Sequence, residues 1–281
     1  MSGLAFTSRA DCVNIGGMTD VALNVADAVA TLTLDRATKR NRLSVALMES
    51  LIDACESLAE RDDVRVVVLQ GAGRDFSVGA DLTDPAMQAI AAAPLGERRR
   101  RLQVGPRLTH AIQALPQTTI AAIQGYCLGG GAVIALASDL RVVAADLTFG
   151  MPEVLRGLNM SWHSVALLVG HLGPARTKEL LITERTVDAE TAVAWGLANR
   201  SAEAGPTAVQ EAASSWAREL AAIVPPIQAS MIKETVNAIA NAQTPMLHMD
   251  RDQFILAQSS EDFREAVRAF LDKRPPRFEN R

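Results

Sequence analysis

Apolar residues in the first two-thirds of the chain switch repeatedly between an alternating and a helical period. Residues 21–25 and 29–34 alternate as two strands that are separated at Asp27. An apolar stripe with helical spacing then runs from Leu47 to Ala59, and Ser44 stands where a helix N-cap is expected. The pattern therefore predicts a strand–strand–helix unit at the start of the chain.

The same alternation of strand and helix patterns continues along the chain. Further strands are expected at 64–69, 120–123, 140–144 and 147–150. Further helices are expected at 107–115, 132–137, 164–169, from Pro174 onward, and at 188–196 with Asp188 as the cap. Strands that alternate with helices indicate an α/β fold.

Only helical patterns follow Thr207. The expected helices cover 207–223, 227–242, the segment around 245–258, and 261–272. For the last helix, Ser259 and Asp262 predict a capping box, and the expected apolar face consists of Phe263, Ala266, Val267, Phe270 and Leu271. The predicted organisation is a flexible N-terminal extension at 1–18, an α/β core at 19–205 and a helical C-terminal region at 206–281.

Composition excludes several classes of partner. The chain has 281 residues, 48% hydrophobic residues and a net charge of −4, which gives it no general attraction for nucleic acid or an anionic membrane. We see neither a secretion signal nor an apolar run of membrane-spanning length. Cys12, Cys55 and Cys127 are scattered and show no metal-binding spacing, so we expect a cytoplasmic protein without a metal site.

Two glycine-bearing stretches carry the candidate chemistry. Residues 75–82 and 125–131 each follow an expected strand, and the second leads directly into an expected helix. Such turns can hold two backbone N–H groups ready for one oxygen that becomes negatively charged, which is the arrangement of an oxyanion hole. The stretches therefore favour a reaction that passes through an oxyanion.

These stretches, together with four further motifs, resemble the crotonase superfamily, the enoyl-CoA hydratase/isomerase family. The resemblance covers roughly residues 20 to 280 with the motifs in the same order. The four further motifs are Arg36-Ala37-Thr38-Lys39-Arg40-Asn41, Phe149-Gly150-Met151-Pro152-Glu153, Ala192-Val193-Ala194-Trp195-Gly196-Leu197-Ala198, and the closing segment from Phe263-Arg264-Glu265 to Arg274.

The resemblance implies a fold, a substrate and an assembly. The core would be a repeated ββα spiral, and the C-terminal helices would form a trimerisation region in a homotrimer or a dimer of trimers. The substrate would be an acyl-CoA thioester, with no bound cofactor and coenzyme A present only as part of the substrate. By motif position, the amides of Ala80 and Gly130 would hold a thioester enolate.

The resemblance also implies that Glu153 is a general acid/base, and it exposes a departure. Many hydratases carry a second glutamate at the position of Val133, which cannot transfer a proton. One carboxylate suffices to move a proton from C2 to C4 of a 3-enoyl thioester, so the residues favour isomerisation over hydration. Ser161 replaces an aspartate of some dienoyl isomerases, which disfavours that activity.

Other positions are expected around the substrate. Trp162 replaces part of a glycine-rich loop and is expected to reshape or shorten the acyl pocket. His163 is either a replacement acid/base or a packing residue. Lys273, with Phe270 one turn earlier, matches positions that contact coenzyme A, although a solvated tail charge is an equal alternative. Arg42, Asp81 and Leu82 complete the set of expected substrate-binding residues.

Two functional alternatives remain open from the sequence. The chain could be a non-catalytic acyl-CoA binding protein, because Val133 and the altered loop after Glu153 remove parts that hydratases use. It could also run another crotonase reaction, such as decarboxylation or C–C cleavage, which needs the same oxyanion hole.

The run of four arginines, Arg98–Arg101, could reach nucleotide phosphates or form a solvated helix face.

Overall fold

A two-residue turn starts the fold. Asp27 (φ 51°) and Ala28 (φ 61°) both adopt left-handed backbone angles and turn β1 (Val21–Ala26) back onto β2 (Val29–Leu34). Two such residues match the right-handed twist of an antiparallel pair. The predicted break at Asp27 is therefore confirmed.

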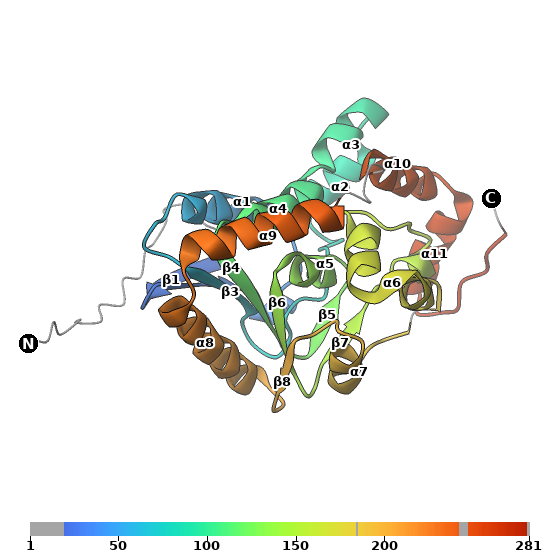
Figure 1. The fold of residues 1–281 in the computed structure, drawn as a ribbon. Coiled ribbons are helices and arrows are strands. Elements are labelled where there is room, and N and C mark those ends of the chain that lie inside the picture. Colours follow the sequence, from blue (N-terminus) through green and yellow to red (C-terminus); the bar gives the residue numbers. More distant parts are fainter. Residues whose placement is uncertain (1–19, 184, 242–246, 280–281) are drawn as a thin grey trace, which may run out of the picture.

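This hairpin forms one edge of a six-stranded sheet (Figure 1). The computed structural model describes residues 20–183, 185–241 and 247–279, so the predicted extension at 1–18 lies outside the described residues. The strand order is β1-β2-β3-β4-β6-β8, and every pair after the hairpin is parallel. The remaining strands are β3 (Val66–Gly71), β4 (Thr118–Ile123), β6 (Leu140–Ala144) and β8 (Arg200–Ala202).

A small second sheet contains part of the second glycine stretch, and an isolated bridge between Ser77 and Cys127 joins it to the first stretch. β5 (Tyr126–Leu128) lies inside the second stretch and pairs in parallel with β7 (Thr148–Gly150). Neither β5 nor β8 was predicted, because three residues are too few to display an alternating pattern. The predicted strand at 64–69 is shifted: β3 begins at Val66 and continues to Gly71, opposite Leu34 of β2.

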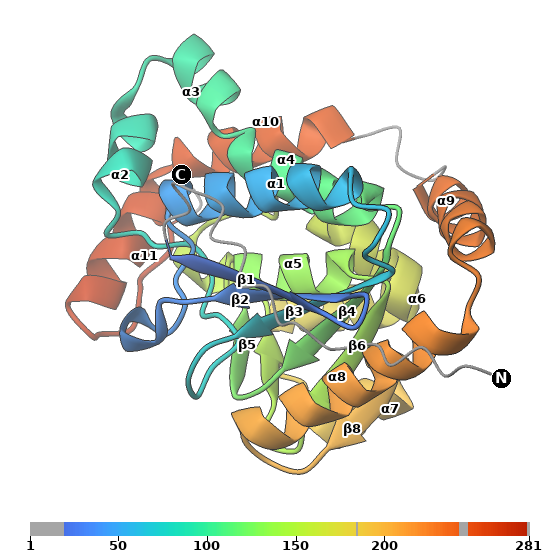
Figure 2. The same ribbon diagram turned by 90° about the vertical axis from the view of Figure 1, so that its left-hand side faces the viewer.

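Helices cover both faces of the large sheet (Figure 2). Alternate residues of β3 divide between the faces: Val67 and Leu69 join the larger core, whereas Val66 and Val68 face the other way. The first face packs against α1 (Val45–Ala59), α4 (Val104–Ala114) and α5 (Gly130–Ala137). The second packs against α8 (Pro206–Ile223), whose contact stripe consists of Val209, Ala213, Ala217 and Ala221.

The remaining helices surround this centre. They are η1 (Ala37–Lys39), α2 (Pro85–Ala92), α3 (Leu95–Arg101), η2 (Val154–Arg156), α6 (Ser164–Thr183), α7 (Ala189–Ala194), α9 (Pro226–Asn241), α10 (Leu247–Gln258) and α11 (Glu261–Leu271). α6 is interrupted at Gly173 (φ 72°), as expected from a new helix beginning at Pro174, which has no N–H to donate. Predicted residues 245 and 246 lie outside the described part of the chain. The α/β prediction and the helical last third are confirmed, and none of the described helices is long and apolar enough to cross a membrane.

The predicted N-cap of α11 is wrong, and its predicted apolar face is only partly buried. Its N-cap is Ser260, whose hydroxyl accepts from the amide of Phe263 at 3.0 Å, whereas the Ser259 hydroxyl donates to the carbonyl of Ile255 in α10. Ser259 still follows the preceding helical turn, so its side chain cannot cap the next helix. The predicted apolar face is buried only in part: Ala266 is buried and Phe263 and Val267 are half-buried, whereas Phe270 and Leu271 are 59% and 70% exposed.

The position of the cap can be tested by two matched substitutions. Ser260→Ala is expected to lower the free energy of unfolding by about 1 kcal/mol, because one helix-terminal amide loses its acceptor. Ser259→Ala should cost less, since its hydroxyl serves only a carbonyl that already belongs to a helix. Urea denaturation of both variants measures the difference. A larger loss for Ser259→Ala would place the cap at Ser259.

Candidate active site

A backbone bridge orients the first glycine stretch. The amide of Leu43 donates to the carbonyl of Gly79 at 2.9 Å, and the amide of Asp81 donates to the carbonyl of Leu43 at 3.0 Å. In a parallel bridge of this kind, the residue between these partners directs its own N–H to the other side. That residue is Ala80, whose amide has no hydrogen-bond partner among the described residues.

The second stretch places its amide at a helix start. Gly129 has φ 53° and ψ −125°, a conformation that a residue with a Cβ rarely adopts, and it precedes the first residue of α5, Gly130. In the described part of the chain the amide of Gly130 also lacks a partner. A Cβ placed on Gly79 would lie 3.4 Å from this nitrogen, so the two stretches touch. The structure thus brings the predicted Ala80 and Gly130 segments together.

A buried amide side chain supports the first stretch. Asn41 is fully buried; its Nδ2 donates to the carbonyls of Ala72 and Asp75, both at 2.9 Å, and its Oδ1 accepts from the amide of Arg36. The Ser77 hydroxyl donates to the carbonyl of Asn41 at 2.7 Å. Sequence reasoning missed these supporting roles. The only signal was the presence of Asn41 and Ser77 within the quoted motifs.

A buried carboxylate ties the first stretch to the second. Asp75 accepts from Arg40 Nε at 2.7 Å and from the amide of Tyr126 at 3.0 Å. Burial by itself raises the pKa of Asp75, but the hydrogen bonds from Arg40 and Tyr126 and the nearby arginine charges outweigh it and hold the pKa below its usual value. The guanidinium of Arg40 also lies 4.6 Å from the Tyr126 ring centroid. The two stretches are therefore held by a charged group as well as by β-pairing.

Glu153 lies beside these amides. A Cβ on Gly129 would be 2.7 Å from Glu153 Oε1, so glycine is needed there to admit the carboxylate. Oε2 is buried and has no hydrogen-bond partner among the described residues, although other atoms of Glu153 remain partly exposed. Burial raises its pKa to about 7, with a smaller opposing effect from the charge of Arg156. A carboxyl group with this pKa can both take and give a proton near neutral pH.

The remaining walls of this site are mostly apolar. Val133 is buried one turn beyond Gly129 on α5, and it has no titratable group. The indole of Trp162 lies against Gly130, where a Cβ would be 2.6 Å from Cζ3. Half-buried Ser161 and His163 flank Trp162. Burial, together with the charge of His110, lowers the pKa of His163 and favours its neutral form.

The other predicted substrate-binding residues lie in or beside the first glycine stretch and at the end of α11. Asp81 is buried and accepts from Thr83 and from Arg36 Nη2, so its carboxylate is engaged within the protein. Arg42 and Leu82 are exposed beside it. α11 packs against η2, where the Arg156 guanidinium lies 5.2 Å from the Phe270 ring centroid. Lys273 lies in the exposed turn after α11.

Comparison with known proteins agrees with this arrangement. The sequence profile of the enoyl-CoA hydratase/isomerase family matches residues 24–281. The chain belongs to the enoyl-CoA hydratase/isomerase family. It is thus an enzyme of the crotonase fold, from a family that acts on CoA thioesters.

Individual relatives cover nearly the whole chain. A Thermus thermophilus protein named as an enoyl-CoA hydratase is 36% identical over 257 residues, which are 89% of this chain and 97% of the relative. The crystal structure of an enoyl-CoA hydratase from Mycobacterium avium subsp. paratuberculosis K-10 superposes with a TM-score of 0.80 at 28% identity, covering 94% of this chain and all of that one. An enoyl-CoA hydratase/carnithine racemase from Magnetospirillum magneticum gives a TM-score of 0.72 at 29% identity, covering 94% and 97%.

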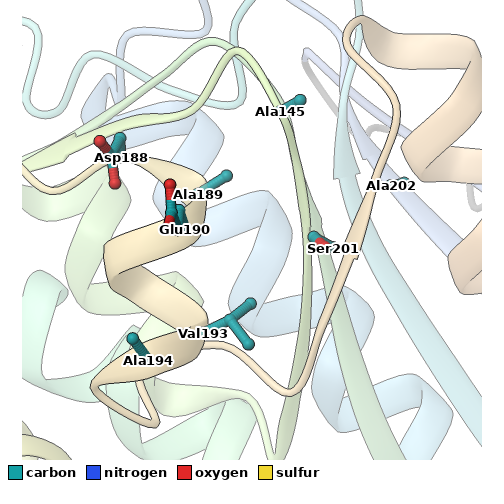
Figure 3. Close-up of a pocket in the computed structure, with 8 residues that line it drawn as sticks. All are labelled: Ala145, Asp188, Ala189, Glu190, Val193, Ala194, Ser201 and Ala202. Carbon is teal, nitrogen blue, oxygen red and sulfur yellow. The ribbon is translucent and has the colours of Figure 1, made fainter.

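A separate surface depression lies outside this constellation (Figure 3). It has a volume of about 600 Å³ and is formed by α7, β8 and the end of β6. Its lining contains none of the predicted site residues, and Asp188 and Glu190 give it two carboxylates. Such a lining would repel the phosphates of coenzyme A, which makes this depression a poor candidate for the substrate site.

The burial of Glu153 predicts a pH-dependent cost in stability. A carboxyl whose folded pKa is raised from 4.5 to about 7 stabilises the fold at low pH, and that contribution is lost as pH rises through the folded pKa. Glu153→Gln should therefore be more stable than wild type above pH 7, by up to roughly 3 kcal/mol, and nearly equal to it below pH 4.5.

Denaturant unfolding at several pH values measures this difference. Glu219→Gln, which removes an exposed carboxylate from α8, controls for the loss of one negative charge. A Glu153→Gln variant that gains no stability between acidic and alkaline pH would show that the carboxylate is well solvated in the folded protein.

Proposed function

We propose that this enzyme stabilises a thioester enolate with the amides of Ala80 and Gly130 and transfers protons through Glu153. The observation that carries the proposal is the combination of two amides that lack partners among the described residues and, beside them, a glutamate whose buried Oε2 also lacks one. Each part alone occurs in ordinary turns and cores. Together they support an arrangement in which donors for a negative oxygen lie next to a group that can move a proton.

The chemistry follows from where charge develops. Removal of a proton from the carbon next to a thioester moves negative charge onto the carbonyl oxygen. One preorganised donor aimed at such an oxygen contributes roughly 3–4 kcal/mol to transition-state stabilisation. Gly130 adds the favourable field at the N-terminus of α5, since the helix dipole favours an anion there.

A single proton-transferring carboxylate favours isomerisation over hydration. Glu153 as carboxylate would take a proton from C2 of a 3-enoyl thioester, and the same group would return it at C4 to give the 2-enoyl product. Addition of water in the two-carboxylate scheme needs a second group to orient and activate the water. Val133 cannot do this, because its side chain has no polar atom.

Coenzyme A recognition would come from exposed side chains beside the first glycine stretch and at the end of α11. Arg42 and Lys273 are exposed cations that can meet phosphates as point charges, and Phe270 presents an exposed ring beside Arg156. Leu82, 50% exposed, and the backbone around Asp81 would border the thioester. We propose that coenzyme A enters only as part of the substrate, in the cytoplasm.

Self-association is part of the proposal. α9 lies along the outside of the protein (Figure 1) and carries a row of apolar side chains that are each more than half exposed. Apolar patches of this kind mark interaction surfaces, and a second copy of the same chain is the occupant we propose, in a trimer or a dimer of trimers. The exposed residues are Ile227, Met231, Ile232, Val236 and Ile239.

A second candidate function is acyl-CoA binding without turnover. It is favoured by Val133 and by Trp162, which fill positions beside the proposed donors with apolar side chains. This alternative predicts tight binding of acyl-CoA by calorimetry with no product from any thioester. Other enolate reactions, such as decarboxylation or C–C cleavage, would use the same two amides.

A turnover assay separates these functions. Purified enzyme is expected to convert a 3-enoyl-CoA to the 2-enoyl-CoA faster than it hydrates a 2-enoyl-CoA. Glu153→Gln should reduce turnover by about 10²- to 10⁴-fold, because the variant cannot exchange the proton. The same assay with Glu219→Gln controls for charge, and calorimetry with acyl-CoA checks that Glu153→Gln still binds. Undiminished turnover in Glu153→Gln would remove the glutamate from the mechanism.

A further inference from the structure

The indole of Trp162 fills a narrow gap between two helices. A Cβ on Gly105, in α4, would lie 2.0 Å from both Cε2 and Nε1 of the indole. A Cβ on Gly130, in α5, would lie 2.6 Å from Cζ3 and 2.8 Å from Cη2. The pyrrole edge therefore meets one glycine and the benzene edge meets the other, and a methyl group on either helix would collide with the ring.

The backbone at this point is held in an unusual conformation. Trp162 (φ 61°) and His163 (φ 63°) are consecutive left-handed residues, and this is a genuine outlier for a bulky side chain. Such a conformation persists only when its surroundings hold it in place. The buried hydroxyl of Thr109 lies 3.2 Å from both the carbonyl of Trp162 and the carbonyl of Gly105, and it can donate to one of them at a time.

One turn of α4 therefore supplies both the space and the tether for the indole. Gly105 supplies the space, and Thr109, four residues later on the same face, contacts the backbone of Trp162. The ring is only partly buried, although it packs on the main core. Part of its surface thus remains exposed, and Leu43 also lies beside Gly130, with its Cδ1 3.3 Å from the position of a Gly130 Cβ.

We propose that the indole of Trp162 closes the end of the acyl-binding site and restricts the enzyme to short-chain acyl-CoA thioesters. In this proposal, Gly105 leaves the space that the indole occupies. This inference rests on the proposed function, because it places the acyl group beside the amide of Gly130. A thioester whose oxygen meets that amide has the indole as its immediate neighbour. A long acyl chain would have to displace a ring that two helices enclose.

Binding of saturated acyl-CoA thioesters tests the proposal without requiring turnover. Calorimetry with acetyl-, butyryl-, octanoyl- and dodecanoyl-CoA is expected to give tighter binding for butyryl-CoA than for octanoyl-CoA in wild type. Trp162→Ala should strengthen octanoyl-CoA relative to butyryl-CoA by at least about tenfold, because each further methylene can then be buried. Trp162→Leu provides the same comparison if the alanine variant does not fold.

A double-mutant cycle tests the role of Gly105. Gly105→Ala in wild type is expected to displace the ring and weaken butyryl-CoA binding, whereas in the Trp162→Ala background it should have no effect. Trp195→Ala is the control for loss of a tryptophan, since that ring contacts Arg176 and Arg185 beside α7. The control should leave the order of affinities unchanged.

The outcomes separate this inference from the proposed function. A wild-type enzyme that binds octanoyl-CoA as tightly as butyryl-CoA, or a Trp162→Ala variant with an unchanged ratio, overturns the role of Trp162. If the chain-length limit is present but no thioester is turned over, the inference stands and the proposed catalysis fails. If none of the four thioesters binds, both fail.

Discussion

The site depends on the contact between two backbone segments that carry little side-chain chemistry of their own. Gly79 approaches the nitrogen of Gly130 so closely that a Cβ would lie 3.4 Å from it, and Gly129 leaves room for the Glu153 carboxylate. β5 pairs with β7, Asp75 accepts from the amide of Tyr126, and Asn41 donates to the carbonyl of Asp75, and these bonds hold the two segments in place. The fold therefore fixes two amide directions before any substrate arrives, which is the condition under which electrostatic stabilisation costs no reorganisation.

Burial raises the pKa of Glu153, which would suit it to proton transfer, and it also lowers the stability of the fold when the carboxyl is ionised. Its Oε1 lies close to Gly129, and burial raises its pKa to about 7. A well-solvated glutamate would have a pKa of about 4.3, and as a weaker base it would take a proton from carbon less readily. In the proposed mechanism, the environment that suits the group to proton transfer also destabilises its charged form, so this position would exchange stability for reactivity.

Sequence patterns anticipated the parts of the fold that repeat over many residues. The alternation in 21–34 and the helical stripe of α1 predicted their elements, and family motifs indicated the glycine stretches. β5, β8 and the cap at Ser260 were missed, because each depends on partners that are far apart in sequence or on a one-residue difference in backbone angle. The packing of Trp162 between Gly105 and Gly130 could not be predicted from the sequence either, since no local pattern links the three positions.

The central claim is that Ala80, Gly130 and Glu153 together make and hold a thioester enolate, whatever reaction follows. Exchange of the C2 protons of butyryl-CoA with solvent deuterium, followed by proton NMR, measures enolate formation directly. We expect the wild-type enzyme to accelerate this exchange, and we expect no acceleration by Glu153→Gln. If butyryl-CoA binds to the wild-type enzyme but exchanges its C2 protons only at the uncatalysed rate, the proposed enolate site is wrong.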